Sequence, residues 1–96
     1  MTNPKPMQLR LLFHSIHNVM LAEELLLKVG IEIDMIPVPR EISSDCGMCL
    51  ACHSKDLDTI RTNFAKAHFT SSIMIYESKT ADKTSAGNCK LILTIP

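Results

Sequence analysis

The chain has 96 residues and a mass of 10.7 kDa, which suits one small domain because two half-length domains would each bury too little surface. Hydrophobic residues make up 46% of the sequence, and 10 basic side chains balance 10 acidic ones. This composition excludes a disordered chain and provides no general electrostatic attraction to DNA. Aromatic residues, at 4%, offer little for stacking on single-stranded nucleic acid. We therefore expect no nucleic-acid partner.

The N-terminal residues do not resemble an export signal, because residues 1–8 contain two prolines and no apolar run before a cleavage site. The most apolar stretch, residues 9–29, is interrupted by His, Asn, Glu and Lys side chains that a bilayer would not accept. We expect a cytoplasmic protein without a membrane partner. In a reducing compartment its four cysteines indicate thiols, metal ligands or redox groups rather than structural disulfides: Cys46, Cys49, Cys52 and Cys89.

The first third of the chain predicts a strand, a helix and a second strand. Residues 9–13 are a short apolar run typical of a buried strand. Ser15 is a suitable helix N-cap, and Gly30 suits the left-handed position after a helix. Residues 31–36 alternate apolar and acidic side chains, as a half-exposed strand does. The 3.6-residue spacing between the two caps predicts an inner helix face of four residues: Val19, Ala22, Leu26 and Val29.

The rest of the chain predicts a loop, two more strands and a second helix. Two prolines, a Ser-Ser-Asp cluster and a glycine mark residues 37–47 as a loop, followed by a short apolar strand over residues 48–52. Ser54 is expected to cap a second helix. Residues 71–76 are expected to form a fourth strand. Residues 90–95 predict either an edge strand or an unattached tail. The second helix is expected to bury Leu57, Ile60, Phe64 and Ala67.

This order of elements predicts an α+β fold, a two-layer ferredoxin-like βαββαβ sandwich with a C-terminal extension. Another two-layer packing with a different strand order remains open. We expect an N-terminal tail over residues 1–8, a domain over residues 9–76, and a linker with a possible extra edge strand or tail over residues 77–96.

The ferredoxin-like order would bring distant residues together at one edge of the sheet. The end of the first strand, the start of the first helix and the loop between the second and third strands would share that edge. His14 and Ser15 would then lie near Arg40 and Cys46. His17 and His53 are expected at the surface.

Cys46 is the candidate reactive residue of this loop. A thiol acts as a nucleophile or carrier only as the thiolate, which backbone N–H groups or a nearby cation stabilise. Gly47 allows backbone amides to turn towards an anion, and Arg40 supplies a permanent cation. Glu41 and Asp45 would oppose ionisation if they faced the thiol. These residues alone leave a functional thiol and an ordinary loop cysteine both open.

Four segments resemble a known family: Phe13-His14-Ser15, Ala22-Glu23, Gly30-Ile31 and the string Pro-x-Pro-Arg-x-Ile-Ser-Ser-x-Cys-Gly over residues 37–47. They are similar to the selenium/sulfur carrier-like family of small bacterial proteins, which also occurs attached to selenium-metabolism proteins. The resemblance covers about residues 9–76 and implies a carrier rather than a turnover enzyme. Such a carrier would relay a persulfide or perselenide from a donor enzyme to an acceptor protein.

The resemblance also implies the site. Cys46 would hold the sulfur or selenium, with Arg40, Ser43, Ser44 and Gly47 around it. His14 or Ser15 would assist. Cys49, Cys52 and the segment after Tyr76 depart from the family pattern.

The extra cysteines leave two alternatives to the carrier. The Cys-x-x-Cys-x-x-Cys spacing is that of the ligands of an iron–sulfur cluster. Cys46, Cys49 and Cys52, with Cys89 as a distant fourth ligand, could bind an iron–sulfur cluster or a zinc ion. If residues 48–52 form a strand, however, Cys49 and Cys52 point to opposite faces, and we expect no cofactor. Cys49 could also act as a resolving thiol for Cys46. The simplest role of both Cys49 and Cys52, however, is to pack in the interior as small buried residues. A non-catalytic interaction module is the second alternative, and the oligomeric state stays open.

Overall fold

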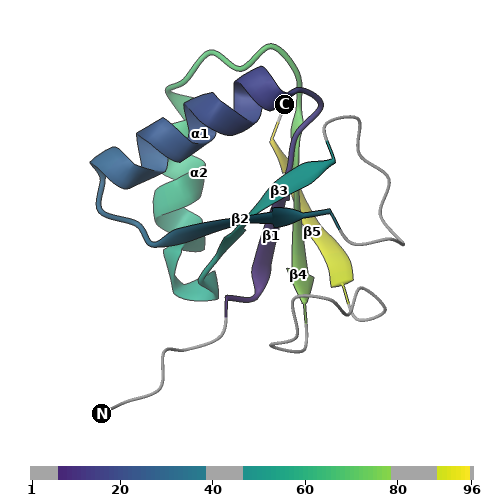
Figure 1. The fold of residues 1–96 in the computed structure, drawn as a ribbon. Coiled ribbons are helices and arrows are strands. Elements are labelled where there is room, and N and C mark those ends of the chain that lie inside the picture. Colours follow the sequence, from purple (N-terminus) through teal and green to yellow (C-terminus); the bar gives the residue numbers. More distant parts are fainter. Residues whose placement is uncertain (1–6, 39–46, 79–88, 96) are drawn as a thin grey trace.

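The computed structural model describes residues 7–38, 47–78 and 89–95, which form an α+β fold (Figure 1). The α+β class predicted from the sequence is therefore confirmed. The elements follow one another as β1 (Leu9–Leu12), α1 (Ile16–Lys28), β2 (Ile33–Pro37), β3 (Met48–Cys52), a 3₁₀ turn (Ser54–Asp56), α2 (Leu57–Ala65), β4 (Ile73–Ser78) and β5 (Cys89–Ile95).

The five strands form one antiparallel sheet in the order β2-β3-β1-β4-β5. β1 lies at its centre, where Leu11 pairs with Leu50 of β3 on one side and with Ile75 of β4 on the other. β5 pairs with β4 and forms an outer edge. Residues 90–95 are thus an edge strand, which was one of the two expected alternatives.

Both ends of α1 form as their residues predict. The Ser15 hydroxyl accepts a hydrogen bond from the Asn18 amide at 3.2 Å, which satisfies one of the open N–H groups of the first turn. At the other end Gly30 has φ +78°, and the Ile31 amide donates to the Leu26 carbonyl at 3.0 Å. This left-handed glycine ends the helix and directs the chain into β2.

Both helices pack on one face of the sheet, where they form the larger core cluster (Figure 1). Alternate residues of β1 meet α1 and α2 there, and the Phe64 ring lies 5.0 Å from that of Phe69 and 6.4 Å from that of Phe13. Val29 of the predicted inner face is instead 45% exposed, because α1 ends at Lys28. The buried residues of this cluster are Leu9, Leu11, Phe13, Val19, Ala22, Leu26, Ile31, Leu50, Cys52, Ile60, Phe64, Ile73 and Ile75.

The predicted cap of the second helix is wrong. Ser54 lies inside the 3₁₀ turn that precedes α2, and no side-chain cap bond forms at either of the two N-cap positions there. The Ser54 hydroxyl instead lies 2.9 Å from Glu77 Oε2 and 3.1 Å from Gln8 Oε1. It therefore connects the turn to β4 and to the start of β1 rather than capping α2.

The opposite face carries a smaller cluster, to which no residue of α1 or α2 belongs. Its buried members are Leu12, Ile36, Cys49 and Ala51. Arg10 shares this face, because it alternates with Leu9 and Leu11 and pairs with Ala51 of β3. Within the described ranges, neither helix has the length and apolar content needed to span a bilayer.

Candidate functional site

The described residues that flank the predicted site loop lie at one end of the sheet. Leu12, the last residue of β1, is opposite Cys49, and Pro37 at the end of β2 is opposite Met48. The Val38 amide donates to the Gly47 carbonyl at 3.0 Å, so the two ends of the intervening loop lie together. The start of α1 follows β1 within a few residues. The end of β1, the start of α1 and the two described ends of the loop thus lie at the same end of the sheet.

Four of the predicted site residues lie outside the described residues: Arg40, Ser43, Ser44 and Cys46. Gly47 directly follows them and has φ +73°, a conformation that a side chain would strain. Gly47 thus has the left-handed conformation that glycine adopts readily.

The structure places His14 and Ser15 in the link between β1 and α1. His14 is exposed, so its imidazole is accessible at this end of the sheet. Ser15 is half-buried, and its hydroxyl oxygen caps α1. The contacts of Ser15 in this structure thus give it a structural role.

Asn18 holds the start of α1 against the segment before β4, which the sequence did not predict. Its side chain is fully buried, and its amide nitrogen donates to the Ser71 hydroxyl at 3.0 Å. Its amide oxygen accepts from the Thr70 hydroxyl at 3.3 Å. The only sequence signal is a polar residue next to Val19 on an otherwise apolar helix face.

Cys49 and Cys52 point to opposite faces of β3, as the odd spacing predicts. Both are 0% exposed. Cys52 belongs to the cluster beneath the helices, whereas Cys49 belongs to the cluster on the other face, with its sulfur 3.9 Å from the Pro37 carbonyl oxygen. Two thiols separated by the sheet cannot bind the same metal ion.

The environment of Cys52 also opposes ionisation. The pKa of the Cys52 thiol is raised from 9.0 to about 12, mainly by burial and to a smaller extent by the charges of Asp56 and Cys49, against an opposing effect of Arg10. A thiol that stays protonated at neutral pH is neither a nucleophile nor a ready metal ligand. In the described part of the chain, no three His, Cys, Asp or Glu side chains are arranged to hold a metal ion. Neither observation favours the iron–sulfur or zinc alternative, whose other two ligands would be Cys46 and Cys89.

Arg10 is a buried cation that the sequence pattern did not predict. Only 1% of the residue is exposed, and its Nη1 atom donates to the Met7 and Leu9 carbonyls at 2.7 and 3.1 Å. Among the described residues, no carboxylate oxygen lies within 4.0 Å of the guanidinium. The available signal was a single charged residue within the apolar run of residues 9–13.

The prediction that His53 lies at the surface is wrong. His53 is 8% exposed and its Nε2 atom lies 2.6 Å from Glu32 Oε1, whereas its Nδ1 atom is buried and has no hydrogen-bond partner among the residues that the structure describes. Its polar side chain follows the strand directly, and the antiparallel pairing of β2 with β3 brings Glu32 to it. A polar residue after a strand thus became buried through a contact with a segment 21 residues away.

Comparison with known proteins identifies the family. The sequence profile of the family described as "Putative Se/S carrier protein-like" matches residues 8–75, which include the predicted site loop. Neither the curated proteins nor the solved structures compared with this chain provide a match. The matched range runs from just before β1 into β4, whereas β5 lies beyond it. Because the profile covers well over half of the sequence, the chain belongs to the Se/S carrier protein-like family.

Proposed function

We propose that this protein is a sulfur or selenium carrier that holds a persulfide or perselenide on Cys46. The observation that carries the proposal is the family match over residues 8–75, within which the Pro-x-Pro-Arg-x-Ile-Ser-Ser-x-Cys-Gly string lies. The turn at Gly47 supports it, because backbone amides in such a turn can face an anion.

Loading would be a thiol–persulfide exchange. The Cys46 thiolate attacks the terminal sulfur of a donor persulfide, R–S–SH, and forms a new S–S bond. The S–S bond of the donor breaks, and its electron pair leaves on the donor sulfur as R–S⁻. The terminal sulfur keeps its proton, so Cys46 becomes a persulfide without any external oxidant or reductant. Transfer to an acceptor thiolate repeats the same exchange with Cys46 as the leaving group.

The properties of the neighbouring cysteines support Cys46 as the carrier. Cys49 and Cys52 are fully enclosed in the two core clusters. The pKa of Cys52, raised to about 12 by burial, keeps that thiol protonated at neutral pH. Neither thiol can approach a donor persulfide without opening of the sheet. Their burial suits a packing role.

We propose that polar and charged residues around Cys46 stabilise its thiolate. The Arg40 guanidinium would compensate the thiolate, and the Ser43 and Ser44 hydroxyls with the Gly47 amide would donate to it. His14, exposed at the same end of the sheet, would accept or return a proton during exchange. Ser15 would act indirectly by capping α1.

The proposal extends to partners, location and architecture. A carrier has to meet a donor enzyme and an acceptor protein, and a reduced Cys46 suits the cytoplasm. We propose no metal cofactor. The β1-α1-β2-β3-α2-β4 order with both helices on one face supports a two-layer ferredoxin-like assignment for the first four strands, to which β5 is added.

Intact-mass spectrometry tests the carrier role. The chain is incubated with a cysteine desulfurase and cysteine, and we expect the mass of an added sulfur atom that a reductant removes. Cys46→Ser should abolish this addition. Cys49→Ala is the matched control, because it removes a buried thiol three residues away and should leave the addition unchanged. Sulfur addition that persists in Cys46→Ser, or no addition to the wild-type chain, would contradict the proposal.

A further inference from the structure

The two edges of the sheet differ in how they are protected against pairing. β2 has five residues and carries Asp34 and Pro37, and both a charge and a proline discourage addition of another strand. β5 has seven residues and one charged side chain, Lys90. It lies outside the range that the family profile matches. The β5 edge is therefore the open one among the described strands.

A register shift divides β5 into two regular segments. The register between β4 and β5 shifts between Ile75 and Tyr76, and such a bulge protects an edge. Beyond this shift, Leu93 pairs with Ile75 and Ile95 with Ile73 in an uninterrupted ladder. The segment from Leu93 to Ile95 thus keeps a regular ladder, to which a further strand can be added.

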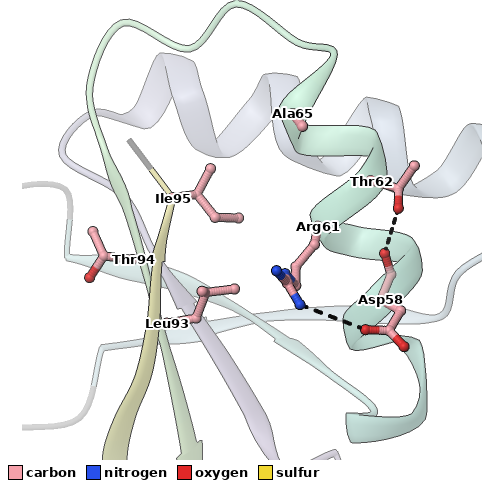
Figure 2. Close-up of a pocket in the computed structure, with 7 residues that line it drawn as sticks. All are labelled: Asp58, Arg61, Thr62, Ala65, Leu93, Thr94 and Ile95. Carbon is pink, nitrogen blue, oxygen red and sulfur yellow. Dashed lines mark hydrogen bonds and ion pairs between the residues drawn. The ribbon is translucent and has the colours of Figure 1, made fainter.

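An open groove lies beside this regular segment, between β5 and α2 (Figure 2). Its volume is about 510 Å³. Leu93 and Ile95 point towards α2 and form an apolar floor, whereas Thr94 points away (Figure 2). Asp58 and Arg61 of α2 lie on the opposite wall. The core beneath the helices therefore continues to the edge of the molecule without being fully covered there.

We propose that a second copy of this chain pairs with the β5 edge in antiparallel fashion, on a two-fold axis at Thr94. Leu93 of each copy would then lie opposite Ile95 of the other, and Thr94 opposite Thr94. An antiparallel strand pair is itself two-fold symmetric, so one surface can serve both copies. The apolar floor of the groove would continue from one copy into the other. This inference goes beyond sulfur transfer and does not depend on it.

Charge favours a second copy as the occupant. The formal net charge is zero, so two copies do not repel each other through their overall charge. Asp58 and Arg61 carry opposite charges on the groove wall, so the same wall of a second copy would present one residue of each sign to it. Within one copy, Arg61 Nη1 lies 3.9 Å from Asp58 Oδ1, and the Asp58 and Arg61 side chains are 97% and 56% exposed. Replacing this exposed ion pair by one between two copies would therefore cost little free energy.

Light scattering coupled to size exclusion, over a concentration series, tests the pairing. We expect the wild-type mass to rise from 10.7 kDa towards twice that value. Thr94→Arg and Thr94→Glu should each remain at the mass of one copy, because like charges would meet directly opposite each other. A mixture of the two variants should recover the doubled mass.

Thr59→Arg is the matched control, because it makes the same substitution at an exposed α2 position outside the groove lining. It should dimerise as the wild type does, and circular dichroism should show the same fold for every variant. A wild-type chain that stays at the mass of one copy overturns the proposal. So does a dimer that Thr94→Arg leaves intact, which would place the interface elsewhere. Sulfur loading on Cys46 should be the same in Thr94→Arg, so the two proposals can fail separately.

Discussion

The two faces of the sheet bury their residues in different ways. Beneath the helices, Leu11 and Phe13 of β1 join aliphatic and aromatic side chains from α1, α2 and β4. On the other face, Leu12 joins a smaller cluster of strand residues, and the same face buries Arg10 and Cys49. Neighbouring residues of one short strand are thus equally buried, but one face has a large apolar cluster and the other a small cluster beside a buried cation.

This difference shows that burial alone does not define a hydrophobic core. The helix-covered face gains its stability from the removal of large apolar side chains from water. The other face has to bury a guanidinium whose only hydrogen-bond acceptors among the described residues are backbone carbonyls. We expect the first face to dominate the free energy of unfolding, and the predictions below test that expectation.

The largest effect is expected for Phe64→Ala beneath the helices. The ring is 2% exposed and packs edge-on against Phe13 and Phe69, so its loss should lower the free energy of unfolding by about 3–5 kcal/mol. Urea denaturation followed by circular dichroism measures the change. Leu27→Ala, at a position of α1 that is 57% exposed, is the control and should change stability by about 0.5 kcal/mol or less. Equal losses in both variants would argue against a dominant helix-side core.

A smaller effect is expected from the pH dependence of Cys52. Below pH 9.0, the usual thiol pKa, the folded and unfolded chains both keep the proton, so this group leaves stability unchanged. Above it the unfolded chain loses a proton that the folded chain retains up to a pKa of about 12. The free energy of unfolding should therefore fall by about 1 kcal/mol per pH unit in that interval.

Denaturation of the wild type and of Cys52→Ala at a series of alkaline pH values measures this slope. Other groups titrate equally in both chains, so the difference between the two curves isolates Cys52. Parallel curves above pH 9.0 would show that the thiol ionises as readily in the folded chain as in the unfolded one.

The smallest effect is expected for Arg10→Met on the open face. Methionine fills a similar volume without a charge to desolvate, so stability should stay within about 1 kcal/mol of the wild type or increase. Thermal unfolding measures the change, and Leu12→Met is the control for a volume-conserving substitution on the same face. A loss of about 3 kcal/mol or more would mean that the hydrogen bonds to Met7 and Leu9 outweigh the cost of burying the cation.

Much of the fold could be predicted because its signals are local. The third strand was predicted with the bounds that the structure shows, Met48–Cys52, and both ends of α1 follow from Ser15 and Gly30. The opposite orientation of Cys49 and Cys52 required only the two-residue period of a strand. The cap of α2 failed because the Ser54 hydroxyl found partners in Gln8 and Glu77, which are far away in the sequence.

The candidate site rests on a different kind of signal. The loop string and its resemblance to a family named Cys46, and the family match covers the loop that contains it. The placement of His14 and the two ends of the loop at the same end of the sheet followed from chain direction, since antiparallel pairing brings the end of β1 beside the start of β3. The buried state of His53 could not be predicted, because it depends on Glu32 reaching it from the neighbouring strand.

The sequence by itself determined the type and order of the elements, the ends of α1 and the thiol at the centre of the proposed function. These depend on spacing, caps and motifs that are read over a few neighbouring residues. Only the tertiary structure decided that Arg10 and His53 are buried, that β5 joins the sheet at β4, and that β5 is the outermost of the described strands. Burial and strand pairing are set by partners distant in the chain, and their energies appear only when those segments pack together.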